Sequence, residues 1–495
     1  MSELPTIRPE SRMLIDGRLV EARDGATFEV INPANQAVVG SVADATADDM
    51  GAAIDAARRA FDETTWSTDR ELRKQCLMQL QDALDREVEE MREQLIQEAG
   101  APRMLTASAQ LDTPLADAIR YPVKLIDEYA WEVDLGEAVN IQGNLDHRKV
   151  VSMAAGVVGA ITPWNFPFEV TINKLAQALA TGNTMVLKPA PDTPLNATLL
   201  GRIIAEQTDI PPGVVNIVPS SDHLRGEDLT LSPKVDLISF TGSTAVGQRI
   251  MEKGAATLKR LFLELGGKSA TVVLDDADLI VASFMGLAVC THGGQGCAIP
   301  TRMLLPRSRY DEGIEALVSM MQNVPYGDPQ RGDVLQGPQI SEKQRQRVLG
   351  YIQNGQEEGA RLVLGGGVPK GEEFDRGFYV EPTLFADVDN SMTIAQEEIF
   401  GPVLVVIPFD DDDDAVRIAN ESRYGLGGGV MAGSHERAMA VADRIRTGML
   451  SINGGAPYGA DLPFGGFKYS GIGRQNGTSG FDQYLERKSY AWPAT

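Results

Sequence analysis

Short apolar runs alternate with longer amphipathic stretches along this chain. The runs at 157–161, 184–188, 214–218 and 237–240 are each followed by a proline or a threonine. The stretch at 195–207 places its leucines and isoleucines three to five residues apart, as on one face of a helix. Short buried strands that alternate with helices predict a parallel sheet with helices on both faces, so we assign the chain to the α/β class.

The same alternation returns in the second half of the chain. Apolar runs at 270–274 and 403–407 predict strands, and the apolar stretch at 279–290 predicts a helix that leads into a glycine-rich loop. Five consecutive aspartates at 410–414 are interpreted as the solvated start of a helix, which the helix dipole favours; a metal site is the alternative. The sequence therefore predicts a second α/β unit.

Other strand and helix patterns lie outside these two units. Residues 13–20 predict a hairpin that turns at Asp-Gly, and residues 70–98 predict one long helical stretch. Residues 147–156 follow a Gly-Asn turn and predict a strand that pairs either within the chain or with a partner subunit. The aromatic C-terminal tail is expected to dock as a strand rather than to hang free.

Composition narrows the class of function. The chain has 495 residues and a formal net charge of −24, which disfavours a nucleic-acid partner because phosphate would be repelled. No apolar run approaches the ~20 residues of a membrane span, and the polar start at residues 1–5 lacks a signal-peptide core, so we expect a cytoplasmic protein without a membrane partner. Three cysteines give no disulfide framework, and four scattered histidines give no metal-ligand spacing, so no metal is expected.

Cys297 is the strongest candidate for chemistry. It ends the loop Gly293-Gly294-Gln295-Gly296, where glycines let the backbone turn sharply and approach a ligand. A thiol on such a loop is typical of a presented nucleophile. Cys290 ends an apolar helical run and Cys76 lies among leucines, so we interpret both as packing residues.

Four further polar residues have both a catalytic or binding interpretation and an ordinary one. Glu264 ends an apolar run before two glycines, where it would serve as a general base or pair with Lys268. Asn165 lies between aromatic and proline neighbours, where it would donate to an oxyanion or hold the turn. Ser243 opens a helix after a strand, where it would form a phosphate site or an ordinary strand-to-helix turn. Lys188 ends a strand, where it would reach a nucleotide or lie exposed on the surface.

Taken together, seven motifs resemble those of the aldehyde dehydrogenase superfamily, in the same order and over roughly residues 10–490. No single motif is specific, but the ordered set is. The motifs are Pro163-Trp164-Asn165-Phe166-Pro167, Lys188-Pro189, Phe240-Thr241-Gly242-Ser243-Thr244, Glu264-Leu265-Gly266-Gly267-Lys268, Gly294-Gln295-Gly296-Cys297, Glu398-Ile399-Phe400-Gly401-Pro402 and Pro463-Phe464-Gly465-Gly466.

The resemblance implies oxidation of an aldehyde to a carboxylic acid with a nicotinamide nucleotide. Cys297 would add to the aldehyde, and the oxyanion of the thiohemiacetal would be held by Asn165 and the Cys297 N–H. Loss of hydride would leave a thioester, for which Glu264 would activate water. The resemblance further assigns the cofactor to Ile161, Thr162, Trp164, Lys188, Ala190, Pro191, Ser243, Gly266, Glu398 and Phe400, and the aldehyde to Phe166, Tyr458 and Phe464.

The sequence predicts the class of substrate and favours one cofactor, and it leaves rival functions to be considered. Phe166, Tyr458 and Phe464 suggest an apolar aldehyde, aromatic or terpenoid, although each also fits ordinary loop packing. Pro191 stands where NAD-preferring relatives often carry a glutamate; we favour NAD and leave NADP open, since no arginine adjoins this motif. One rival is a coenzyme A-acylating semialdehyde dehydrogenase, a branch that tends to lack the base at Glu264. The others are a non-catalytic structural protein of the crystallin kind and a thiol hydrolase without cofactor, for which no histidine is placed by sequence to pair with Cys297.

The resemblance also implies three parts for the fold. A Rossmann-like nucleotide-binding domain would comprise residues 1–130 and 151–263, and an α/β catalytic domain would comprise residues 264–463. A β-arm of residues 131–150 and 480–495 would join subunits, so a homodimer or homotetramer is expected. The expected partners are therefore a small-molecule aldehyde and further copies of this chain.

Overall fold

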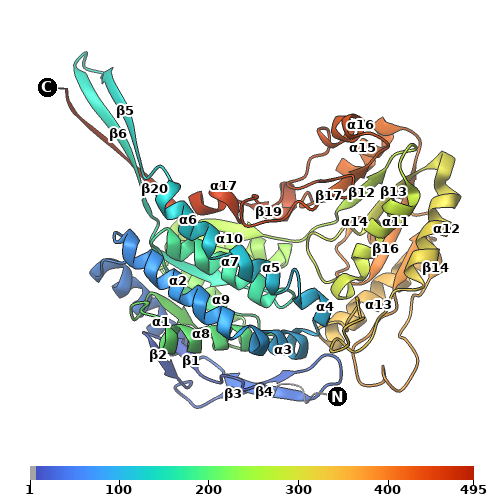
Figure 1. Cartoon of the computed structure of the whole chain (residues 1–495), viewed down its shortest axis with the longest axis horizontal. Coiled ribbons are helices and arrows are strands. Elements are labelled where there is room, and N and C mark those ends of the chain that lie inside the picture. The colour runs from blue at the N-terminus through green and yellow to red at the C-terminus, as the bar shows by residue number, and fades with distance from the viewer. Residues whose placement is uncertain (1–6, 495) are drawn as a thin grey trace.

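Two large sheets and one projecting three-stranded sheet organise the computed structural model, which describes residues 7–494 (Figure 1). The polar segment 1–5, which supported the cytoplasmic expectation, lies outside the described residues. None of the helices within 7–494 combines the length and the apolar character that a membrane crossing requires. The α/β class predicted from the hydrophobic pattern is confirmed.

The first sheet has eight strands, with a parallel centre and antiparallel edges. At one edge, β1 (Met13–Ile15) and β2 (Arg18–Val20) form the predicted hairpin, and at the other, β19 (Gly471–Ile472) lies against β11 (Arg260–Glu264). The strands between them are β10 (Leu237–Thr241), β7 (Val157–Ile161), β8 (Thr184–Lys188) and β9 (Val215–Ile217). A separate pair, β3 (Thr27–Ile31) and β4 (Val38–Ala43), lies near the N-terminus.

Alternate residues of these strands enter two cores, one on each face of the first sheet. Val157 packs in the same core as α1 (Ala47–Glu63), whereas Val158 packs in the same core as α7 (Pro167–Ala180). Side chains alternate across a strand, so the continuous apolar runs are buried on both faces. The other helices around this sheet are α2 (Arg70–Arg86), α3 (Val88–Ala99), α4 (Arg103–Thr106), α5 (Asp112–Asp117), α6 (Arg120–Glu128), α8 (Leu195–Gln207), α9 (Leu224–Leu231), α10 (Thr244–Gly254) and α17 (Gly477–Asp482).

Local chemistry sets where these helices begin and end. Thr46 and Asp49 form a capping box at the start of α1. The stretch predicted as a single helix at 70–98 is instead divided at Glu87, whose φ of −97° and ψ of 8° leave helical geometry. α7 begins at Pro167, because the fixed φ of proline suits a first helical turn.

The second sheet has seven strands, and all except the edge strand β14 (Arg361–Leu364) run parallel. Val272 and Val273 again enter different cores on its two faces. The remaining strands are β15 (Thr383–Ala386), β16 (Val403–Phe409), β13 (Arg302–Pro306), β12 (Ala270–Val273), β17 (Gly428–Met431) and β18 (Ser451–Ile452), and the helices are α11 (Leu279–Gly286), α12 (Tyr310–Met321), α13 (Glu342–Glu357), α14 (Thr393–Gln396), α15 (Asp412–Asn420) and α16 (His435–Ala442).

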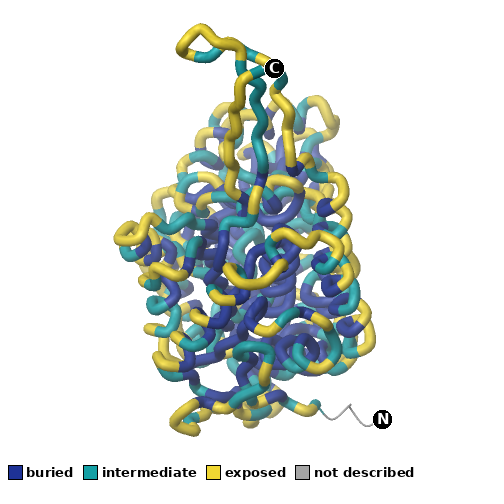
Figure 2. The backbone as a smooth tube through the Cα atoms, turned by 90° about the vertical axis from the view of Figure 1, so that its left-hand side faces the viewer, coloured by how far each residue is buried: buried dark blue, intermediate teal, exposed yellow. Residues whose placement is uncertain are grey.

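Three strands project from the body as an arm, at the upper left of Figure 1 and the top of Figure 2. They are β5 (Glu132–Val139), β6 (Leu145–Ala154) and β20 (Leu485–Pro493). β20 pairs antiparallel with β6 over its whole length. The C-terminal tail is therefore a docked strand, as predicted, and the strand expected at 147–156 pairs within its own chain.

Candidate active site

The carboxyl ends of the parallel strands in the first sheet lie side by side. Ile161 pairs with Lys188 of β8, and Thr241 pairs with Glu264 of β11. Phe240 of β10 pairs with Ile161, so these residues form one row across the sheet. Open α/β sheets bind ligands outside this edge. The predicted motifs directly follow these strands, so they lie at the same edge.

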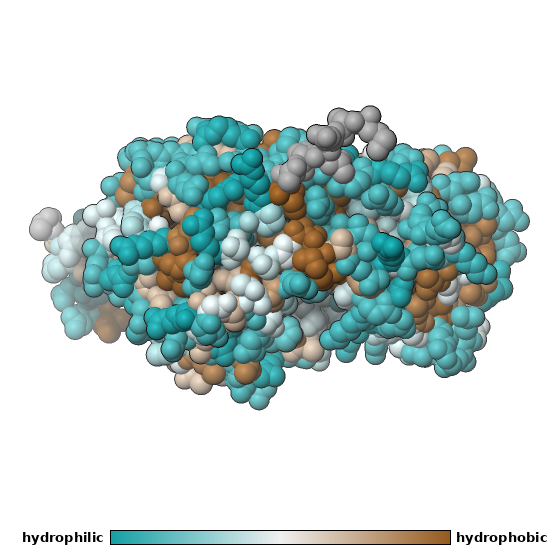
Figure 3. All heavy atoms as spheres, turned by 90° about the horizontal axis from the view of Figure 1, so that it is seen from below, coloured by the Kyte–Doolittle hydropathy of each residue, from teal (hydrophilic) through white to brown (hydrophobic). Residues whose placement is uncertain are grey.

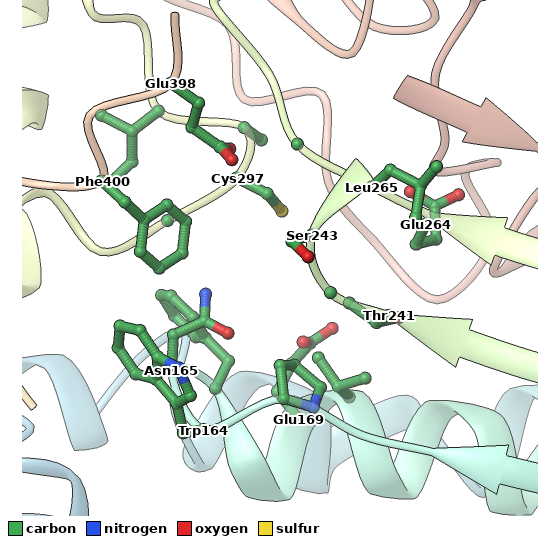
Figure 4. Close-up of a pocket in the computed structure, with 18 of the residues that line it drawn as sticks. Trp164, Asn165, Glu169, Thr241, Ser243, Glu264, Leu265, Cys297, Glu398 and Phe400 are labelled. Atoms are coloured by element: carbon green, nitrogen blue, oxygen red, sulfur yellow. The ribbon is translucent and has the colours of Figure 1, made fainter. Parts of the chain in front are cut away.

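A cavity of about 490 Å³ opens at this edge, and the loop that carries Cys297 forms part of its wall (Figure 4). Its lining is mainly apolar and draws on residues that are distant in the sequence. Most of the predicted site residues meet here. Those that line the cavity are Trp164, Asn165, Phe166, Ser243, Glu264, Gly266, Cys297, Glu398, Phe400, Tyr458 and Phe464.

Cys297 is half-buried, and its sulfur points into the cavity (Figure 4). Glycines allow the close packing around its loop. A Cβ on Gly294, whose φ is +74°, would lie 2.1 Å from the Gly401 oxygen, and one on Gly267 would lie 2.5 Å from the Cys297 oxygen. Burial, reinforced by nearby carboxylates such as Glu264, raises the pKa of the Cys297 thiol. The resting thiol is therefore protonated and needs a base before it can attack.

The two other cysteines are packing residues, as predicted. Cys76 and Cys290 are fully buried in separate hydrophobic cores. Burial raises the pKa of Cys76 to about 11 and that of Cys290 to about 12. Of the three cysteines, all of which lie within the described residues, Cys297 alone lines the cavity.

Asn165 lies in the turn between β7 and α7 and contacts the Cys297 loop. Its side-chain Nδ2 donates to the main-chain carbonyl oxygen of Gln295 at 2.9 Å. The main-chain carbonyl oxygen of Asn165 accepts from Gln110 Nε2 at 2.7 Å. An amide nitrogen carries two hydrogens, so one N–H holds the loop and the second stays available toward the cavity. The turn-holding and oxyanion interpretations of Asn165 are thus compatible.

Glu264 carries a buried carboxyl without hydrogen bonds. It is 2% exposed, and neither of its oxygens has a partner among residues 7–494. The alternative ion pair with Lys268 is wrong, because the Lys268 amine likewise finds no partner within the described chain. Burial raises the pKa of Glu264 well above its usual value, against the opposing charges of Lys174 and Arg474. Unpartnered buried carboxyls are costly, and such groups concentrate at functional sites.

Several predicted cofactor residues form one wall of the cavity. Ser243 caps the N-terminus of α10, where backbone N–H groups favour an anion. A Cβ on Gly266 would lie 2.4 Å from Glu398 Oε2, so only glycine lets that carboxylate lie there. Trp164 and Phe400 pack edge to face with ring centroids 5.3 Å apart. This wall therefore combines an anion site at Ser243, an aromatic pair and, at Gly266, a stretch of backbone without a side chain.

Lys188 is buried, so its interpretation as an exposed surface lysine is wrong. Its Nζ donates to the Ser220 carbonyl oxygen at 3.1 Å. Burial lowers the pKa of Lys188 to about 8, although the charges of Asp222 and Asp44 oppose that shift. Five predicted cofactor residues lie at the ends of β7 and β8, outside the cavity lining: Ile161, Thr162, Lys188, Ala190 and Pro191.

Three polar residues near the site were missed from the sequence. Glu169 and Gln475 line the cavity, and Lys174 is buried on α7 with its Nζ 3.1 Å from a serine hydroxyl of β10. Glu169, Asn173 and Gln177 recur every four residues along this buried helix. That polar stripe on a largely apolar helix is the sequence signal that would have indicated Glu169. No three His, Cys, Asp or Glu side chains within 7–494 gather as metal ligands would.

A parallel sheet with a cavity at its carboxyl edge is typical of α/β proteins that bind nucleotides, and comparisons with known proteins show the family. The model of the aldehyde dehydrogenase family matches residues 19–490. A 3-succinoylsemialdehyde-pyridine dehydrogenase of a Pseudomonas species is 41% identical over 491 residues, which cover 98% of each chain.

Solved structures agree with this match. Mycobacterium tuberculosis aldehyde dehydrogenase in complex with NAD⁺ is 41% identical, with a TM-score of 0.93 over 98% of this chain and 99% of that one. Betaine aldehyde dehydrogenase of Staphylococcus aureus in complex with NAD⁺ is 33% identical, with a TM-score of 0.94 over 98% and 95% of the two chains.

The chain belongs to the aldehyde dehydrogenase family, as its ordered motifs predicted. It is therefore an oxidoreductase that acts on aldehydes. Both of these related structures are complexes with NAD⁺, in agreement with the nicotinamide nucleotide expected from the sequence.

Proposed function

We propose that this protein oxidises an aldehyde to the free carboxylic acid with NAD, through a thiohemiacetal and a thioester on Cys297. The observation that carries the proposal is that Cys297, Asn165 and Glu264 line one cavity together with Ser243 and Glu398. The proposed nucleophile, oxyanion donor and general base thereby share a single cavity with half of the residues assigned to the cofactor.

The first step makes the carbonyl carbon tetrahedral. The Cys297 sulfur adds to the aldehyde carbon, and the free N–H of Asn165 and the backbone N–H of Cys297 hold the resulting oxyanion. Such a donor contributes about 3–4 kcal/mol in other enzymes. When bound, the nicotinamide ring supplies the acceptor for the hydride that this tetrahedral carbon expels. The carbon then remains on the sulfur as a thioester.

The second step releases the acid, and Glu264 activates the water. A carboxyl with a raised pKa is a stronger base once ionised, and the charges of Lys174 and Arg474 favour its ionised form. In Figure 4 the Glu264 carboxyl lies apart from the Cys297 sulfur, so the proposed step requires that its side chain rotate toward the thioester. The same rotation would let it accept the thiol proton beforehand.

The carboxyl edge of the first sheet fits a dinucleotide. Ser243 and the N-terminus of α10 provide an anion site for the pyrophosphate, and Glu398 is placed for a ribose. Gly266 leaves its surface free of a side chain for the nicotinamide. Lys188 uses one of its three N–H donors on Ser220, which leaves two for the second ribose. We therefore propose that residues 1–130 and 151–263 form the nucleotide-binding domain and that residues 264–463 form the catalytic domain.

The charges around Lys188 favour NAD over NADP. The carboxylates of Asp44 and Asp222 act on this lysine, and a 2′-phosphate would meet their repulsion. Arg225 is already paired with Asp222 at 3.3 Å and with Asp228 at 2.9 Å. The chain therefore offers the additional phosphate no uncommitted arginine at this point.

The cavity supports an apolar or aromatic aldehyde. Phe166, Tyr458 and Phe464 line it, and the last two pack edge to face at 6.0 Å. The Pseudomonas relative carries pyridine in its name, which supports an aromatic substrate here. The terpenoid and aromatic expectations from the sequence therefore stand as proposals.

An NADH-formation screen over an aldehyde panel, with NAD and with NADP, tests the proposed function. We expect NADH and the free acid, and Cys297→Ala should lose more than about a thousandfold of kcat/KM while still binding NAD. Cys76→Ala, which removes a thiol far from the cavity, is the matched control. Substantial turnover by Cys297→Ala, or an acyl-coenzyme A product when coenzyme A is added, would contradict the proposal.

A further inference from the structure

A second buried carboxylate faces the cavity beside the proposed machinery. Glu169 lies in the first turn of α7, is 8% exposed and lines the cavity with Cys297. In Figure 4 its carboxylate points into the space toward which the Cys297 sulfur also points. The proposed reaction assigns no task to this residue, because Cys297, Asn165 and Glu264 already supply the nucleophile, the donor and the base.

The two oxygens of Glu169 have different surroundings. Oε1 accepts from the Tyr458 hydroxyl at 2.5 Å, from Asn173 Nδ2 at 2.6 Å and from Gln475 Nε2 at 3.4 Å. Oε2 receives no hydrogen bond from any residue between 7 and 494. Three donors therefore fix the carboxylate by one oxygen and leave the second oxygen to the cavity. Burial raises the pKa of Glu169, and the hydrogen bonds from Tyr458 and Asn173 and the charge of Lys174 oppose this shift.

A role confined to packing does not account for this asymmetry. If Glu169 only tied Tyr458 to α7, a neutral amide or hydroxyl would do so without placing a carboxylate in an apolar cavity. The neighbouring lining residues Phe166, Val170 and Phe464 offer Oε2 no donor. A bound molecule that carries a donor would supply the missing hydrogen bond and offset the cost of burying the charge.

We propose that the aldehyde substrate carries a hydroxyl or ammonium group on its apolar or aromatic body, and that Glu169 Oε2 accepts a hydrogen bond from this group. The inference rests on the proposed function, since it concerns the aldehyde that Cys297 attacks. Glu169 thereby determines substrate specificity: it selects donor-bearing aldehydes and repels aldehydes that carry a carboxylate.

Matched aldehydes that differ only by the donor test this inference. We would compare 3- and 4-hydroxybenzaldehyde with the corresponding methylbenzaldehydes, and 8-hydroxyoctanal with nonanal, because a methyl group replaces a hydroxyl at similar size. We expect kcat/KM to favour the hydroxylated partner of at least one pair by about 10- to 100-fold, the range for a hydrogen bond to a charged acceptor. The preference should appear chiefly in KM.

Substitution of Glu169 should remove this preference. Glu169→Gln keeps the shape of the side chain and should reduce the hydroxyl-to-methyl ratio of kcat/KM about tenfold; Glu169→Leu should bring it close to one. Glu357→Gln, at an exposed position of α13 outside the cavity, is the matched control and should keep the wild-type ratio. Because the readout is a ratio within one protein, a general loss of activity does not mimic the expected result.

The outcomes distinguish a failure of this inference from a failure of the proposed function on which it rests. Wild-type turnover of the methyl and hydroxyl partners at equal kcat/KM in every pair would overturn the role of Glu169 and leave the proposed function standing. A wild-type preference that persists in Glu169→Leu would also overturn it. If no aldehyde in the panel yielded NADH, the proposed function itself would fail, and the inference with it.

Discussion

At the scale of single residues, the site gathers ionisable groups whose pKa values are moved by burial. Burial raises the pKa values of both the Cys297 thiol and the Glu264 carboxyl, so burial favours the protonated form of each group. A proton must leave this pair before sulfur can attack, and the buried cation of Lys174, whose own pKa burial lowers to about 8, lies close enough to favour ionised Glu264. The pKa values of the site therefore depend mainly on the burial of its ionisable groups from water.

Glu264→Gln should separate the two halves of the proposed reaction. We expect a rapid burst of NADH and then a steady state slower than wild type by about 100-fold or more, because the amide cannot deprotonate the water that releases the acid. Rapid-quench measurement of NADH and of free acid checks this. A variant without any burst would show that Glu264 acts earlier, as the base for the Cys297 thiol.

His292→Asn should make the protein less sensitive to acid. His292 is fully buried, and burial lowers its pKa to about 4 from an ordinary value of 6.5. The unfolded chain then binds more protons than the folded one between these values, so stability rises with pH across that window and is lost as pH falls from 6.5 to 4. The lost stability amounts to about 3 kcal/mol at most.

Asparagine suits the left-handed backbone of His292, whose φ is +51°, and removes the titration. Apparent Tm measured from pH 7 to pH 4 should therefore fall more steeply for wild type than for His292→Asn. Parallel Tm curves for the two proteins would show that His292 does not carry this acid sensitivity.

At the scale of elements, the turns and loops after the strands make the site, rather than the strands themselves. β7, β10 and β11 end in one row, and the turn before α7, the cap of α10 and the glycines after β11 then enter the cavity wall. The Cys297 loop reaches the same wall from the second sheet, between α11 and β13. Its position depends on a close contact with the backbone at Gly267.

Gly267→Ala should misplace the nucleophile without unfolding the protein. The new Cβ would lie 2.5 Å from the Cys297 carbonyl oxygen, a backbone atom that cannot turn away as a side chain would. We expect kcat to fall about 10- to 100-fold, the cost of a misplaced reacting group. Gly350→Ala, on an exposed turn of α13 with nothing within 4 Å of the added atom, is the control. Unchanged kinetics in Gly267→Ala would contradict this role for the contact.

At the scale of the whole molecule, the body and the arm differ in what they offer to a partner. The face of the body in Figure 3 is largely hydrophilic, as the net charge of −24 leads one to expect. The arm instead exposes apolar side chains on a thin sheet that has no core of its own. Exposed apolar residues on the arm are Val133, Leu135, Val139, Ile141, Leu145, Met153, Tyr490 and Trp492. We propose that further copies of the chain cover them in a homodimer or homotetramer.

Charges placed on the arm should weaken assembly. We expect wild type to elute as a dimer or tetramer in size-exclusion chromatography with light scattering, and Leu135→Asp combined with Ile141→Asp to shift it toward monomer at micromolar concentration, because a buried unpaired carboxylate is costly. Glu137→Gln on the same strand is the control. A monomeric wild type, or a double variant that assembles normally, would contradict the proposed role of the arm.

The order of residues along the chain was enough to predict the α/β class, the first hairpin and the identity of the family. These features depend on hydrophobic period, turn chemistry and short motifs, which are local in the sequence. Local patterns could not show that Lys188 is buried, that Glu264 and Lys268 are unpaired, or that the stretch at 70–98 breaks at Glu87. Those outcomes depend on the distant segments that pack against each residue.

The cavity carboxylate of Glu169 is the clearest example of this division. Its place two residues after Pro167 is visible in the sequence, but its hydrogen-bond partners Tyr458 and Gln475 lie about 300 residues away. Whether a glutamate caps a helix, pairs with a cation or faces a substrate depends on the dielectric and the donors around it. Folding brings those together, so the chemistry of the family could be predicted from the order of residues, whereas the selectivity of the cavity required the packed structure.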